Sequence, residues 1–110
     1  MSDINNTEAY AVFDSSDGSL TFFRDTPGLY TNNQVDGTKT YYTDIETRTA
    51  SSTSNAPWYS NRASVQSIIF EDIIIPKSTA CWFYGMNFTS IVGLEKLNTS
   101  NVTSMYGMFY

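Results

Sequence analysis

Two runs of strand-forming residues near the start of the chain flank a polar turn. The runs cover 8–13 and 18–23, and Asp and Gly in the turn between them are residues that favour hairpins. We therefore predict a β-hairpin. Alternation sorts its apolar residues into two faces, one with Tyr10, Val12, Leu20 and Phe22, the other with Ala11, Phe13 and Phe23. Because both faces are apolar, we expect one of them to pack on a later part of the chain.

The periodicity fades between residues 25 and 61. Pro27-Gly28 and Asp36-Gly37 are breaks, and 51–57 is a tract of small and polar residues. Within this segment, 39–43 followed by Ile45 is typical of a short strand, because Thr and Tyr are good strand formers. Long irregular segments inside compact domains are usually functional or mobile, so partner contacts are expected here first. For Trp58 we expect burial under the hairpin.

The most apolar stretch follows. Residues 65–75 alternate and end at Pro76, which predicts one buried strand over that range. Residues 78–85 predict a short helix, with a hydroxyl residue as N-cap and Gly85 as the left-handed stop. Together these elements indicate an α+β, β-rich fold: an N-terminal β-hairpin and mixed sheet in 8–76, then strand and short-helix units in 77–110, all in a single domain.

Composition supports a folded chain and narrows its chemistry. The 110 residues are 41% hydrophobic, so a core can form, and 11 acidic against 6 basic residues give a net charge of −5. This charge repels a phosphate backbone, so direct nucleic-acid binding is not expected. The chain has no histidine, which excludes His-based catalysis and imidazole metal sites. We expect no enzyme activity, no catalytic residues, no metal and no cofactor.

Several residues could be reactive or could bind a metal, but a structural role explains each of them more simply. Cys81 lies among Ala and aromatic residues and is expected to be a buried small hydrophobe. Asp14 and Asp17 are expected to stabilise the hairpin turn rather than bind calcium. Glu71 and Asp72 are neighbours that would point to opposite faces of a strand, which favours solvent exposure and edge protection over an acid pair.

The C-terminal third contains a repeat-like spacing. Apolar residues at 91, 94 and 97 are followed by Asn98, and the aromatic run 82–84 recurs in part at 108–110, 26 residues later. Both features are compatible with the strand and asparagine turn of a leucine-rich repeat. In particular, the run 93–109, with its Thr-Ser-Asn-Val-Thr segment at 99–103, closely resembles the repeat of the BspA-like leucine-rich-repeat surface proteins of bacteria. Segments 8–12, 20–22, 57–62 and 67–70 resemble the region that leads into such repeats.

The resemblance implies a non-enzymatic recognition or adhesion module that binds protein or glycan and is secreted or attached to the cell surface. Residues 1–7 contain neither a basic nor an apolar signal region, and no apolar stretch is long enough to insert into a membrane. The second hypothesis is therefore a small acidic cytoplasmic inhibitor, such as a phage-encoded one, that docks on a basic surface of a nucleic-acid-handling enzyme. The repeat units are expected to be incomplete at the C-terminus, so self-association through that open end is a third expectation.

The partner-binding candidates are aromatic and acidic residues of the middle segment and one residue of the repeat end. They are Tyr30, Tyr41, Tyr42, Asp44, Glu46 and Phe109. Amphipathic aromatic side chains on loops are typical of protein interfaces, and the carboxylates would serve a basic partner.

Overall fold

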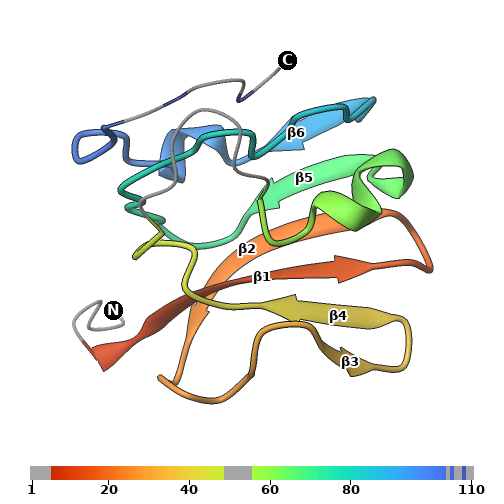
Figure 1. Cartoon of the computed structure of the whole chain (residues 1–110), viewed down its shortest axis with the longest axis horizontal. Coiled ribbons are helices and arrows are strands. Elements are labelled where there is room, and N and C mark those ends of the chain that lie inside the picture. Colours follow the sequence, from red (N-terminus) through yellow and green to blue (C-terminus); the bar gives the residue numbers. More distant parts are fainter. Residues whose placement is uncertain (1–5, 49–55, 104, 106–107, 109–110) are drawn as a thin grey trace.

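The computed structural model describes residues 6–48, 56–103, 105 and 108. The described residues form one six-stranded mixed sheet, with the strand order β3-β4-β1-β2-β5-β6 (Figure 1). The strands are β1 (Glu8–Asp14), β2 (Ser19–Asp25), β3 (Gln34–Asp36), β4 (Lys39–Tyr42), β5 (Ser67–Phe70) and β6 (Ser90–Val92). The described part of the chain also contains two 3-10 helices, η2 (Tyr59–Ser64) and η3 (Leu94–Lys96). The β-rich prediction is thus confirmed.

The predicted first hairpin is present as β1 and β2. Its turn is held by the two aspartates, as expected: Asp14 Oδ1 accepts hydrogen bonds from the backbone N–H and hydroxyl of Ser16, and Asp17 Oδ1 accepts one from the N–H of Ser19. Gly18 completes the turn with φ +73°, a conformation that glycine adopts without steric cost. Both aspartates are therefore turn residues.

The predicted sorting of the hairpin into faces was wrong. Ala11 pairs with Phe22 and Phe13 with Leu20, so these four share the buried face, while Tyr10 pairs with Phe23 on the other face. The error comes from register. Side chains alternate with a period of two, so the length of the turn decides which residues of the two strands meet, and a shift by one residue exchanges the faces.

The middle segment is more ordered than its sequence suggested. The predicted strand at 39–43 is confirmed as β4, and β3, which was not predicted, pairs with it across the Asp36-Gly37 turn. Strand β4 also pairs antiparallel with β1, so this second hairpin extends the sheet on the side away from β5. Ile45 follows β4 and is fully buried.

A single strand over 65–75 was a wrong prediction. Strand β5 ends at Phe70 and pairs in parallel with β2. Beyond this point the side chain of Asp72 accepts the backbone N–H of Arg24 at 2.9 Å, taking the donor that a longer strand would have used. The chain then returns to pairing only at Ile74, through an isolated parallel bridge to Leu97.

The predicted helix over 78–85 was also wrong. The segment forms turns, and its Cys81 has φ +58°, which no interior residue of a right-handed helix adopts. Gly85 does take the expected left-handed conformation, with φ +73°. The N–H groups of Trp82 and Tyr84 bond three residues back within the segment, as in single turns, while the N–H of Phe83 bonds to the carbonyl of Met108 at 2.8 Å.

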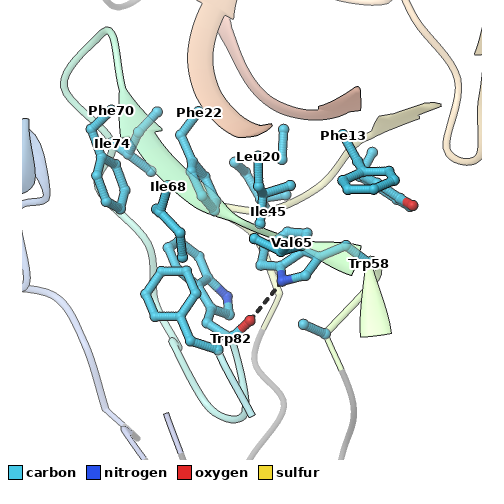
Figure 2. Close-up of a cluster of buried hydrophobic side chains, with 14 of the residues drawn as sticks. Phe13, Leu20, Phe22, Ile45, Trp58, Val65, Ile68, Phe70, Ile74 and Trp82 are labelled. Carbon is cyan, nitrogen blue, oxygen red and sulfur yellow. Dashed lines mark hydrogen bonds between the residues drawn. The ribbon is translucent and has the colours of Figure 1, made fainter. Parts of the chain in front are cut away.

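The core lies between one face of the sheet and a layer of turns (Figure 2). Trp58 and Trp82 of that layer are fully buried, and the indole N–H of Trp58 donates to the backbone carbonyl of Trp82 at 2.6 Å. Phe22 of the sheet stacks on Phe70 at 4.7 Å and on Trp82 at 5.1 Å between ring centroids. The expected burial of Trp58 is confirmed, and aromatic side chains on turns do the packing that helices usually do.

Candidate interaction surfaces

In the C-terminal part of the fold the chain runs twice in the same direction, over residues 67–74 and again over 90–97, and we call these two runs the parallel passes. Ser67 pairs with Ser90, Ile68 with Ile91 and Ile69 with Val92, and the bridge from Ile74 to Leu97 keeps the same spacing. Chemically similar residues therefore lie side by side at an offset of 23 residues. The predicted offset of 26 from the aromatic runs falls partly on residues 109 and 110, which lie outside the described residues.

One end of the sheet presents an unpaired strand edge. In the described part of the chain β6 pairs with β5 alone, so its other edge carries open backbone donors and acceptors. The strand itself is uncharged, and Val92 and the following Leu94 are 58% and 45% exposed. We call Ser90, Ile91, Val92 and Leu94 the β6 end. An uncharged edge beside exposed aliphatic side chains is suited to pairing with another chain.

The sheet face opposite the core carries an aromatic cluster. Tyr30 stacks on Tyr41 with 3.9 Å between ring centroids and 5° between ring planes, and Tyr10 meets Tyr30 edge-on at 5.1 Å. Phe23 contacts all three rings. Burial raises the pKa of the Tyr10 and Tyr30 hydroxyls. These four residues, the tyrosine cluster, hold the connection between β2 and β3 against the sheet.

A small acidic cavity lies at the start of β1. It measures about 290 Å³, and its lining residues include Glu8, Asp44 and Glu46 beside apolar ones such as Ala9 and Ile45. Glu46 forms an ion pair with Arg24 and accepts the backbone N–H of Ile75 at 2.6 Å. Glu8 accepts the N–H of Gly28 at 2.9 Å and the hydroxyl of Tyr10 at 3.0 Å. Two of the three carboxylates are thus already engaged within the fold.

The structure distributes the predicted partner-binding residues over separate places. Tyr30 and Tyr41 meet in the tyrosine cluster, where Tyr41 is 8% exposed, and Asp44 and Glu46 meet at the acidic cavity. Tyr42 is a core residue at 1% exposure, its hydroxyl accepting a hydrogen bond from Asn61, so its ring is not offered to a partner. Phe109 lies outside the described residues.

The β6 end was not predicted as a site. Its residues were read as part of a repeat, and nothing local in the sequence says whether a strand such as 90–92 is central or at an edge. That distinction depends on the strand order of the whole sheet, which places β6 last. The one available signal was the density of aliphatic residues from Ile91 to Leu94 in a region otherwise rich in Ser, Thr and Asn.

Other possible sites are limited in the described part of the chain. Cys81 is buried there, as expected for a small hydrophobe. Within residues 6–48 and 56–103, together with 105 and 108, no group of three or more Cys, Asp or Glu side chains is arranged to hold a metal ion. The helices of the same residues include none that has the length and apolarity to span a membrane. Comparisons with protein-family models, curated proteins and solved structures find no match to this chain.

Proposed function

We propose that the chain is a non-enzymatic recognition module, similar in kind to BspA-like leucine-rich-repeat surface proteins, that binds a protein strand through the β6 end. This proposal is carried by the uncharged β6 edge, which is unpaired among the described residues and has Val92 and Leu94 exposed beside it. Strand addition to such an edge gains main-chain hydrogen bonds along the edge and burial of aliphatic side chains on its flank. The family resemblance adds a secreted or surface location, and a glycan as a second class of ligand.

The opposite edge of the sheet is the natural reference. Strand β3 also ends the sheet, but it carries Asp36, and Lys39 lies across from that residue on β4. Charged side chains at an edge discourage pairing with another chain. The β6 strand has no charged residue, and this difference favours β6 as the binding edge.

The parallel passes support the repeat part of the proposal. Their like-on-like pairing, Ser on Ser and Ile on Ile, places equivalent residues of successive passes side by side, as in solenoid proteins. Each pass of a solenoid buries its apolar side against its neighbours, so a pass with a described neighbour on one side alone leaves aliphatic residues exposed. The exposure of Val92 and Leu94 follows this rule.

A second copy of the chain is the first partner to test. Light scattering across a concentration series measures the mass of the 110-residue chain, and we expect a concentration-dependent dimer that Val92→Lys weakens at least about tenfold, because a charge would be buried in the paired edge. Val35→Lys is the matched control, since Val35 is 68% exposed on the other edge strand. A dimer that both variants weaken equally would contradict a role of the β6 end.

The inhibitor hypothesis retains one specific observation, the acidic cavity. Glu8, Asp44 and Glu46 line one concave place on a chain whose net charge is −5, and of the three carboxylates Glu46 is balanced by Arg24. A lysine or arginine side chain of a basic partner fits that charge. A chain that stays monomeric at every concentration would favour this second function over the first.

A further inference from the structure

Tyr30 and Tyr41 are held in an arrangement that differs from every other tyrosine contact among the described residues. Their rings lie parallel within 5° at 3.9 Å, while Tyr10 meets Tyr30 at 88° and Tyr59 meets Tyr84 at 6.2 Å and 38°. Two parallel rings at this centroid distance lie face to face, so carbons of one ring lie against carbons of the other.

Tyrosyl radicals couple chiefly at the ring carbons ortho to the hydroxyl group. Loss of one electron and one proton from a phenol leaves a radical that is shared between the oxygen, the two ortho carbons and the para carbon. In tyrosine the para carbon carries the side chain, so the ortho carbons are the ones that couple. Coupling requires two such carbons to meet near van der Waals distance, and holding them there removes the entropic cost of the encounter. An edge-on contact such as that of Tyr10 with Tyr30 directs the rim of one ring at the face of the other and does not pair these positions.

We propose that Tyr30 and Tyr41 form an oxidative cross-linking site, at which hydrogen peroxide and a peroxidase convert the stacked pair into dityrosine. The two phenols together lose two electrons and two protons, and one peroxide accepts them and becomes two water molecules. A carbon–carbon bond forms between the rings. The hydrogen on each bonded carbon then moves to the phenolic oxygen, which restores both hydroxyl groups.

The position of the pair gives the cross-link a structural effect. Tyr41 belongs to β4, and Tyr30 lies in the connection between β2 and β3. The bond would join that connection covalently to the sheet and limit the unfolded chain between residues 30 and 41. Cross-links of this kind raise stability chiefly by restricting the unfolded state. This inference is independent of the β6 end.

The test uses the full chain with horseradish peroxidase and hydrogen peroxide, at a protein concentration low enough to disfavour coupling between molecules. Mass spectrometry of a digest should show peptides containing residues 30 and 41 joined, with the loss of two hydrogen atoms, and dityrosine fluorescence should rise with them. Oxidation of methionine adds mass instead, so the two reactions are distinguished.

Three variants decide the assignment. Tyr30→Phe and Tyr41→Phe each keep the ring but lose the phenol, and each should abolish the linked peptide, while Tyr84→Phe should leave its yield unchanged. Circular dichroism of every variant, before oxidation, checks that the fold is retained. Cross-linking that proceeds equally in Tyr30→Phe, that joins Tyr59 to Tyr84 as readily, or that joins only separate molecules would overturn the proposal.

Discussion

The two sides of the sheet are built by different means. The antiparallel side, β3-β4-β1-β2, consists of two hairpins closed by short turns with Asp and Gly at their ends. On the parallel side, no hairpin turn joins β5 to β2 or β6 to β5, and each strand is placed by contacts distant in sequence, such as the pairing of β5 with β2. Local signals therefore specify the first side, whereas the position of β5 is set by its contact with β2 of that side.

The two edges differ in the same sense. Strand β3 lies in a local hairpin and has a charged residue, whereas β6 is uncharged and, among the described residues, pairs with β5 and packs Ile91 against the core. The edge strand that carries a charge, β3, is thus the one formed by a local hairpin, and the uncharged edge strand, β6, is the one suited to pairing with another chain. The predictions below test how far the two sides of the sheet depend on each other.

The largest effect is expected where the two sides meet. Phe22 lies on β2, which pairs with both β1 and β5, and its ring stacks on Phe70 and Trp82. Phe22→Ala should lower the free energy of unfolding by about 3–5 kcal/mol, because it leaves a cavity in the shared core. Urea denaturation measures this, and both sides should unfold in one transition. Separate transitions for the two sides would contradict the dependence.

Leu29→Ala is the control for that experiment. Leu29 is 47% exposed in the connection after β2, so its truncation should change the free energy of unfolding by less than about 0.5 kcal/mol. A loss comparable to that of Phe22→Ala would show that the core argument misplaces the stability of the fold.

A pair of glycines separates the two sides more sharply. Gly93 has φ +77°, and a Cβ there would lie 2.3 Å from the backbone oxygen of Phe70, so Gly93→Ala should cost roughly 2–4 kcal/mol from strain and collision. Gly37 has φ +60° but open space around it, so Gly37→Ala should cost only about 1 kcal/mol. Thermal or urea unfolding compares them, and equal costs would argue against a close approach of the β6 turn to β5.

The ion pair under the acidic cavity should have a smaller effect. Glu46 bonds to Arg24 of β2 and to the N–H of Ile75 beyond β5, so it ties the segment after β4 to both sides. Glu46→Gln should lower the free energy of unfolding by about 1–3 kcal/mol through the loss of the charged partner of Arg24. In Asp44→Asn, the exposed neighbour, the change should stay within about 0.5 kcal/mol. Urea denaturation of the two variants measures both changes in the free energy of unfolding. An equal loss in the two would contradict a structural role of Glu46.

The smallest effect concerns acid tolerance of the first hairpin. Hydrogen bonds from the hydroxyl and N–H of Ser16 lower the pKa of Asp14 below its ordinary 3.8. The ionised carboxylate therefore contributes stability above that value, and the contribution is lost as the pH falls from about 3.8 through the lowered pKa. NMR titration of the Asp14 carboxyl carbon should show the shift. A titration midpoint at or above 3.8 would mean that the turn does not depend on this charge.

Much of the antiparallel side could be predicted from the sequence. The hairpin of β1 and β2 and the strand β4 were visible because their signals are local: alternating apolar residues, and turns of Asp and Gly. Which hairpin residues lie on the buried face could not be predicted, because the pairing of Ala11 with Phe22 depends on the register that the turn imposes. Strand β3, with three residues, is too short for a periodic signal.

On the parallel side the same reasoning succeeded less well. The apolar run 65–75 was identified as buried, but Asp72 ends the strand by bonding to Arg24, a residue 48 positions away. Residues 78–85 carry helix-compatible signals at both ends, yet Trp82 and Phe83 are packed into the core from a turn. Tyr30 and Tyr41 were identified from the sequence as candidate binding residues. Their stacking could not be predicted, because it brings together the connection after β2 and strand β4.

The sequence by itself determined that this is a folded, acidic, β-rich chain with no histidine and with turns at Asp14–Gly18 and Asp36-Gly37, because composition and local turn chemistry act within a few residues. Only the tertiary structure decided that β6 lies at an edge, that Tyr42 is in the core and that Tyr30 stacks on Tyr41. These three facts depend on strand order and register, which are set by contacts between segments far apart in the chain.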